Sequence, residues 1–276
     1  MARRYPRDEL IARLHAQIDA SCALLIFGAG SGLSAKSAES GGADIIAMYS
    51  TAGIRMKGLP SIMSSLPYHD CNTLLLEIAH EALPLVKETP CVAGVGAHDQ
   101  IRVMDSFLNE LSELGFSGIA NEPFAGSYGA YFAELMEEAG VGFSREVDMI
   151  RLAHQRGLFT LAWCTSPKEA KRMSEAGADM IGAMVLYGPL STDTRSEEKK
   201  LSDSLDTVRA IRDAALCVRK DVLVITHGSP FMDKVSAEIS IKETNAVGYA
   251  CGSSGERIAA QKGIKEITEQ YKSIRI

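Results

Sequence analysis

The sequence predicts a (β/α)8 TIM barrel, an α/β fold, from three observations. Short apolar runs recur along the chain, and each ends in a small or polar residue that precedes a stretch with helical spacing. Strands separated by helical crossovers lie parallel, because a crossover returns the chain beside the strand it left. The 276 residues fit one such barrel, which takes roughly 250 residues. The eight runs cover residues 24–27, 45–49, 91–95, 117–120, 159–163, 180–184, 222–226 and 247–251.

An extra helix is expected before the first strand. Residues 1–22 carry apolar side chains at helical spacing, at Leu10, Ile11, Leu14 and Ile18. We expect this helix to cap the bottom of the barrel, and we expect residues 1–276 to form a single domain.

The helices between and after the strands can be placed by their local signals. Two helices, over 128–139 and 145–156, are expected after the fourth strand. Pro230 suits the first position of the helix that follows the seventh strand. The loops over 50–69 and 185–197 are long enough to act as lids, and packed surface loops are the alternative.

The last helix is predicted by one apolar stripe at helical spacing, made by Ile264, Ile267, Tyr271 and Ile274. Ser253, with Glu256 three residues later, has the pattern of a capping box that would open this helix. We therefore expect the stripe to be buried against the barrel.

Composition excludes several classes of partner. The net charge of −6 gives no basic field for nucleic acid, and no apolar stretch reaches membrane-spanning length. The six cysteines lack CxxC spacing, which indicates reduced thiols in a cytoplasmic protein. Cys164 and Cys251 close two strands, so a catalytic thiol is an alternative to core filling. We expect a homo-oligomer, with the N-terminal helix or a long loop at its interface.

The first strand ends in a string of small residues. Gly28, Gly30 and Ser31 would let a ligand approach the backbone, and a helix starting near Ser34 would offer its amides to an anion. The spacing is GxGxG rather than the dinucleotide GxGxxG. A tight turn that needs glycine is the alternative.

The second strand ends in a group that could cradle a carboxylate or phosphate. Backbone amides and hydroxyls are the donors, and Arg55 and Lys57 lie just beyond them. An ordinary solvated loop is the alternative. The residues of this predicted cradle are Tyr49, Ser50, Thr51, Ala52 and Gly53.

The third and fourth strands end in acid and base candidates. His98 and Asp99 could supply a general base or metal ligands, although Asp99 could instead cap a helix from Gln100 onward. Glu122 places a carboxylate at the same mouth, where a salt bridge to a neighbouring strand end is the alternative role.

The seventh and eighth strands end where many barrels hold a phosphate. His227 could move a proton or donate to an anion, and Arg257 could screen the charge. Turn and capping needs also explain glycines and serines here. The predicted anion-binding residues are Gly228, Ser229, Gly252, Ser253 and Ser254.

These motifs resemble one known family. The segments 28–55, 94–99, 121–124 and 225–230 are similar to the phosphoenolpyruvate hydrolase-like family of TIM barrels. The family resembles, more distantly, the phosphoenolpyruvate mutase and isocitrate lyase superfamily. That resemblance implies Mg²⁺ held through Asp99 and Glu122, with an α-keto acid bound at residues 49–53. The aspartate-rich third strand end of that superfamily is reduced here to His98 and Asp99.

The resemblance implies a hydrolase or lyase that acts on a small anionic substrate, phosphonopyruvate or phosphoenolpyruvate, through a metal-stabilised enolate. His98, Asp99, Glu122 and His227 would be catalytic. A sugar-phosphate isomerase or aldolase is an alternative, although no strand-end lysine is available for a Schiff base. A non-catalytic barrel for ligand sensing or protein interaction is the second alternative.

Overall fold

Eight parallel strands close into a barrel in sequence order, which confirms the predicted (β/α)8 fold. The computed structural model describes residues 2–186 and 195–276. Each predicted run overlaps one strand. The strands are β1 (Leu24–Ala29), β2 (Ile45–Met48), β3 (Cys91–Val95), β4 (Gly118–Asn121), β5 (Phe159–Cys164), β6 (Met180–Val185), β7 (Leu223–Gly228) and β8 (Gly248–Cys251).

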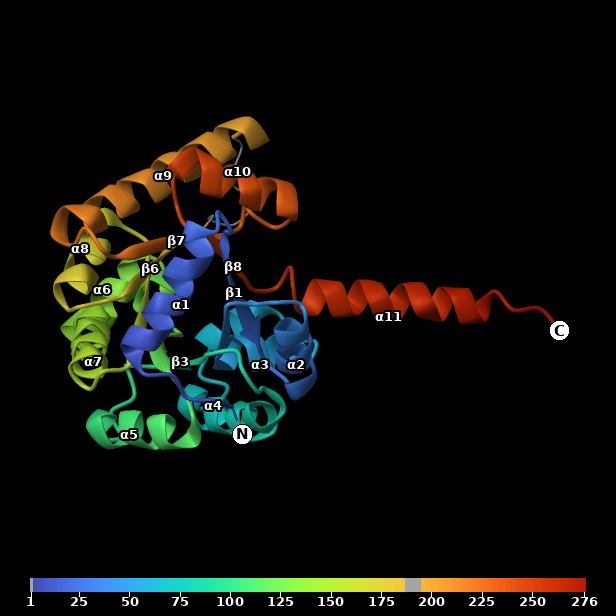
Figure 1. Cartoon of the computed structure of the whole chain (residues 1–276), viewed down its shortest axis with the longest axis horizontal. Helices are drawn as coiled ribbons and strands as arrows, with labels where there is room; N and C mark the ends of the chain where they lie inside the picture. Colours follow the sequence, from blue (N-terminus) through green and yellow to red (C-terminus); the bar gives the residue numbers. More distant parts are fainter. Residues whose placement is uncertain (1, 187–194) are drawn as a thin grey trace.

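Helices surround the barrel and fill its crossovers (Figure 1). No helix of the described ranges is long and apolar enough to span a bilayer. The α-helices are α1 (Arg7–Asp19), α2 (Gly32–Ser40), α3 (Ser50–Met56), α4 (Cys71–Ala82), α5 (Met104–Leu114), α6 (Ala130–Glu138), α7 (Phe143–Gln155), α8 (Pro167–Glu175), α9 (Glu197–Val218), α10 (Lys234–Thr244) and α11 (Arg257–Lys272). Short 3₁₀ turns are η1 (Ser61–Ser65), η2 (Leu83–Leu85) and η3 (Ala125–Tyr128).

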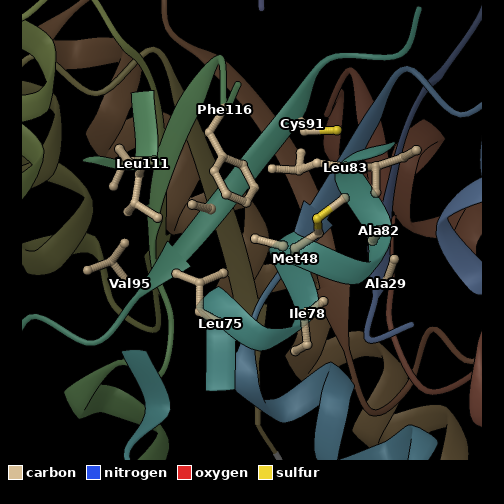
Figure 2. Packing of buried hydrophobic residues seen from close by; sticks show 14 of the residues in the cluster. Ala29, Met48, Leu75, Ile78, Ala82, Leu83, Cys91, Val95, Leu111 and Phe116 are labelled. Carbon is tan, nitrogen blue, oxygen red and sulfur yellow. The ribbon is translucent and has the colours of Figure 1, made fainter. Parts of the chain in front are cut away.

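The strands divide the core into an inner and an outer part, because successive side chains point to opposite faces. Ile26, Val92 and Leu161 fill the barrel interior, and Leu10 and Leu14 of α1 belong to the same buried cluster. The predicted extra N-terminal helix therefore packs on the barrel interior. The outward side chains of β1 to β3 pack against α4 and the end of α5, as Figure 2 shows.

Two predicted helix starts are wrong. α10 begins at Lys234 rather than near Pro230, because Asp233 and Ser236 form its capping box. α11 begins at Arg257 without a side-chain cap, so the box predicted for Ser253 and Glu256 does not form.

The long second loop also differs from its prediction, because α3 follows β2 at once and η1 lies within the remainder. The predicted pair of helices after β4 is present as α6 and α7. In the other predicted lid, 185–197, residues 187–194 lie outside the described residues.

α11 projects from the barrel as an isolated arm (Figure 1). Its predicted stripe is exposed instead of buried: Ile264 is 65% exposed, Ile267 44% and Tyr271 69%. No residue of α11 is buried in the single chain. An amphipathic helix gains most of its stability by burying its apolar face, so this stripe lacks a partner within the chain as described.

The chain just after β1 approaches α3 so closely that position 30 must be glycine, which has no side chain. A Cβ there would lie 2.1 Å from the carbonyl carbon of Ala52, which is closer than any van der Waals contact. We expect Gly30→Ala to lower the free energy of unfolding by about 1–3 kcal/mol, measured by urea denaturation. Gly41→Ala is the matched control, because its Cβ would meet no atom closer than 3.4 Å. Equal losses in the two variants would contradict the packing argument.

Candidate active site

A cavity of about 380 Å³ lies at the carboxyl ends of the strands. Its wall comes mainly from residues at or just beyond the ends of β2, β4, β5, β6, β7 and β8, and from η1. This is the face of the barrel where enzymes of this fold hold their substrates. The residues that line it include Tyr49, Thr51, Arg55, Glu122, Trp163, Met184, His227, Gly228, Ser229, Tyr249, Gly252, Ser253 and Ser254.

Glu122 supplies the carboxylate of this cavity. Thr51 donates a hydrogen bond of 2.8 Å to Glu122 Oε1, so the group is positioned by a hydroxyl rather than by the salt bridge considered as its alternative role. Burial raises the pKa of Glu122 to about 7, against the opposing effects of the Thr51 hydrogen bond and the Arg55 charge. At neutral pH this carboxyl group can therefore both accept and donate a proton.

His227 lies in the same cavity as a neutral imidazole. Burial lowers its pKa to about 4. Its Nδ1 is 2.6 Å from the carbonyl oxygen of Ala250, which can only accept, so Nδ1 carries the proton. The other nitrogen, Nε2, is then an acceptor. Trp163 packs beside the ring with a centroid separation of 5.4 Å.

Arg55 places a buried cation at the cavity wall. Its side chain is 5% exposed, and Nη2 donates to Tyr49 Oη at 3.1 Å and to Glu256 Oε2 at 3.3 Å. Its buried Nε has no hydrogen-bond partner. The sequence pattern placed Arg55 beside the second strand end but gave Glu256 to a helix cap, so their ion pair was missed.

Gly252 keeps space open between the side chains of His227 and Arg55. A Cβ at this position would lie 3.7 Å from His227 Nε2 and 3.8 Å from Arg55 Nη1. These two nitrogens therefore approach one region of the cavity from different elements, β7 and α3.

The predicted glycine-rich segment after β1 lies outside the cavity lining. Gly28 packs against Tyr49, whose Oη would be 2.0 Å from a Cβ there. Ser31 caps α2 by accepting from the backbone N–H of Ser34. These residues and Gly30 serve packing and capping, whereas the alternative interpretation was a tight turn that needs glycine.

The predicted cradle after β2 is divided by the start of α3. Tyr49 and Thr51 line the cavity, whereas Ser50, Ala52 and Gly53 are buried in the helix and do not. Seven other predicted residues do line it, from β4, β7 and β8: Glu122, His227, Gly228, Ser229, Gly252, Ser253 and Ser254.

His98 and Asp99 are not brought together with Glu122, and neither lines the cavity. Asp99 accepts from Arg102 Nη1 at 2.6 Å and from Asn72 Nδ2 at 3.0 Å. These hydrogen bonds outweigh burial and hold the pKa of Asp99 well below its usual range. His98 contacts Cys71 instead, with Nε2 at 3.7 Å from Sγ. The carboxylate of Asp99 is thus committed to a structural ion pair.

The predicted metal ligands Asp99 and Glu122 do not line the same cavity, because Glu122 lines it and Asp99 does not. Among the described residues, no three His, Cys, Asp or Glu side chains are grouped to hold a metal ion. Within the cavity lining as described, Glu122 is the sole acidic residue. Mg²⁺ in proteins is held by one or two carboxylates together with water and substrate oxygens. The one carboxyl group here has a pKa of about 7 and already accepts from Thr51, so this donor set does not fit a resident ion.

The thiol alternative is not supported either. All six cysteines are free. Burial raises the pKa of Cys164 well above its usual value and also raises that of Cys251. Both remain protonated near neutral pH, whereas nucleophilic attack needs a thiolate.

Comparisons with known proteins agree with the fold and with the predicted resemblance. A family model described as "Phosphoenolpyruvate hydrolase-like" matches residues 9–274. Two proteins of Solanum lycopersicum, the ToMV resistance protein Tm-1(GCR237) and the ToMV susceptible protein tm-1(GCR26), are each 38% identical over 269 residues. That alignment covers 97% of this chain but 36% of each relative, so the chain spans about a third of their length.

Solved structures with the same fold include two enzymes. Phosphoenolpyruvate phosphomutase from Streptomyces platensis subsp. rosaceus superposes with a TM-score of 0.59 at 17% identity, covering 96% of this chain and 86% of the enzyme. Phosphonopyruvate hydrolase in complex with oxalate and Mg²⁺ gives a TM-score of 0.60 at 16% identity, covering 95% and 87%. At these identities the likeness shows the barrel architecture.

Proposed function

The chain belongs to the phosphoenolpyruvate hydrolase-like family, and from that premise we propose that it is an enzyme acting on a small phospho- or phosphono-keto acid. Phosphonopyruvate and phosphoenolpyruvate are the proposed substrates, and hydrolysis is the proposed reaction. One observation carries the proposal: a carboxyl group with a pKa of about 7, on Glu122, shares a small cavity with the neutral imidazole of His227 and the buried guanidinium of Arg55.

Glu122 and Arg55 each have a role in the proposed hydrolysis of phosphonopyruvate. Ionised Glu122 takes a proton from water as the water oxygen forms a bond to phosphorus. The carbon–phosphorus bond breaks, and its electron pair moves into the keto group to give an enolate. Arg55 supplies positive charge beside the cavity, which stabilises that enolate. The proton that Glu122 took from water is then delivered to carbon, so that the products are pyruvate and phosphate and Glu122 is ionised again.

The only support for magnesium is a solved structure with the same fold. The hydrolase structure named above holds Mg²⁺ with oxalate. Because the donor set in this cavity does not fit a resident ion, no step of the proposed reaction passes through a metal.

The direct test is product release from candidate substrates by the purified protein. Phosphonopyruvate and phosphoenolpyruvate would be supplied separately, once with Mg²⁺ and once with EDTA, and pyruvate and phosphate would be measured. Release of both products above the uncatalysed rate is expected. A folded protein that turns over neither compound under either condition would contradict the proposal and favour a ligand-sensing or protein-interaction role.

The pH dependence of turnover should follow Glu122. A general base works only when ionised, and burial places the pKa of this carboxyl at about 7. We expect kcat/KM to fall as the pH drops through about 7, whereas His227, with a pKa of about 4, stays neutral over that range. A pH–rate profile from pH 5 to 9 measures this. A profile flat between pH 6 and 8 would exclude Glu122 as the base.

A sugar-phosphate isomerase is the second candidate. It is favoured by the glycine and serine residues after β7 and β8, because Gly228, Ser229, Gly252 and Ser253 line the same cavity. Turnover of dihydroxyacetone phosphate, without turnover of either keto acid, would support it.

We also propose that the chain forms a homo-oligomer in which α11 of one copy packs on another. A groove of about 1030 Å³ lies along β1 and β8, between α1 and α10. Apolar residues of all four elements and their flanks line it, including Ile18, Leu25, Ala237, Ile241 and Val247.

The groove lies where the last helix of a (β/α)8 barrel normally packs, and its apolar lining matches the apolar stripe of α11. In a (β/α)8 barrel, the helix after the last strand covers the seam between the last strand and the first. Here that helix points away from the seam, with its apolar stripe exposed (Figure 1). Exchange of α11 between two copies would bury both surfaces at once. The interface would thus come from the C-terminal helix, rather than from the N-terminal helix or a long loop.

A further inference from the structure

We propose that Arg55 binds the anionic group of the substrate, and that the site holds this anion without a divalent metal. The inference rests on the proposed function and adds the residue and the chemistry of recognition. A carboxylate or phosphonate oxygen is the ligand it would take.

Arg55 is built into the wall of the cavity rather than carried on a mobile surface. Its side chain is 95% buried, since 5% is exposed. Of the cavity-lining residues in the described ranges, it is the sole arginine or lysine. A guanidinium in so little water interacts with an anion far more strongly than a surface cation does.

The guanidinium is fixed from one side. Tyr49 Oη and Glu256 Oε2 both accept from Nη2. Glu256 is itself anchored, because its Oε1 accepts from the backbone N–H of Gly30 at 2.6 Å and from Ser34 Oγ at 2.8 Å. Such preorganisation removes the entropic cost of ordering a long side chain when the ligand binds.

The Nη1 amino group of the guanidinium has unused donors. In the described chain, both side-chain hydrogen bonds of Arg55 leave from Nη2, and none leaves from Nη1. A donor in the cavity wall that lacks a protein partner can bind a ligand oxygen at little cost to the fold. Nη1 lies beside the space that Gly252 leaves open, next to His227.

The charges in the cavity also favour a cation of the protein over a metal ion. A bound Mg²⁺ is usually neutralised by carboxylates together with substrate oxygens. The described cavity offers Glu122 alone, and its pKa of about 7 leaves it partly protonated at neutral pH. Arg55 already supplies the positive charge that a keto-acid anion requires.

Isothermal titration of oxalate tests the proposal. Oxalate would be added to the full-length chain in excess EDTA and, separately, in Mg²⁺. We expect similar affinity in both buffers. We expect Arg55→Met, combined with Glu256→Gln to avoid an unpaired buried carboxylate, to weaken binding by about 10-fold or more, the range for a charge-assisted hydrogen bond. Lys57→Met is the matched control: this exposed lysine follows the same helix outside the cavity lining and should leave affinity unchanged.

A second variant keeps the ion pair intact. Gly252→Ala would place a methyl group 3.3 Å from His227 Cε1 and 3.8 Å from Arg55 Nη1, and should also weaken oxalate binding. This variant keeps the test valid if the double variant does not melt cooperatively.

The outcomes separate the two proposals. Oxalate binding that requires Mg²⁺ would overturn the metal-free site while leaving the proposed enzyme class standing. Metal-free binding that survives both the Arg55 and the Gly252 substitutions would overturn the role of Arg55. A folded wild-type protein that binds neither oxalate nor phosphoenolpyruvate in either buffer would overturn the proposed function itself.

Discussion

Glu122→Gln is expected to lower kcat for the keto-acid substrate by about 100-fold or more, the usual contribution of a general base. The amide keeps the size of the carboxyl group and can still accept from Thr51, so KM should change much less than kcat. The Thr51 hydrogen bond of 2.8 Å positions the oxygen but does not supply the base. Steady-state kinetics with pyruvate release measures both constants.

The control for this substitution is Glu138→Gln. Glu138 is an exposed glutamate at the end of α6, and the change should leave both constants unaltered. A Glu122→Gln enzyme with wild-type kcat would remove Glu122 from the mechanism. Unfolding by Glu122→Gln is not expected, because burial already disfavours the ionised form of this side chain.

Disrupting the stripe of α11 is expected to have the second large effect. Ile264→Asp together with Ile267→Asp should raise the dissociation constant of the homo-oligomer by more than about 100-fold, because each buried isoleucine contributes about 1.5–3 kcal/mol. Both side chains are exposed in the single chain, at 65% and 44%, so folding of the barrel should be preserved. Size-exclusion chromatography with light scattering measures the mass.

Lys262→Asp provides the matched control for α11. Lys262 is exposed on the same helix, away from the apolar stripe, and its substitution introduces an acid without removing an apolar contact. The assembly should therefore survive. A wild-type protein that is monomeric at about 10 μM, well above a typical stable-dimer Kd, would contradict the proposal that α11 packs on a second copy.

The strands were predictable because their signal is local. Strands buried on both faces by helices form continuous apolar runs, and β3, β5 and β6 are buried along their whole length. The helix starts were less predictable. Ser253 and Glu256 satisfy the spacing of a capping box, but the carboxylate of Glu256 is taken by Arg55, which lies 201 residues away in the sequence. A local pattern carries no information about such a partner.

The residues of the candidate site were predictable where their position at the end of a strand is enough to place them in the cavity. The carboxyl ends of parallel strands share one mouth, and this rule places Glu122 and His227 in one cavity. It failed for Asp99, where Asn72 and Arg102 turn the side chain away. The direction of a side chain beyond a strand end depends on the neighbouring loops, which a single sequence does not reveal.

Glu256, at the base of the arm formed by α11, limits how far the chain can be truncated from its C-terminal end. Residues 261–276 are all exposed, and a protease that removed them would expose no further core. Glu256 immediately precedes the arm, and its carboxylate holds Gly30, Ser34 and Arg55 across the barrel seam. Cleavage ahead of Glu256 would leave a buried guanidinium without its counter-ion. The arm is expendable for the integrity of a single barrel, but its first anchoring residue is not.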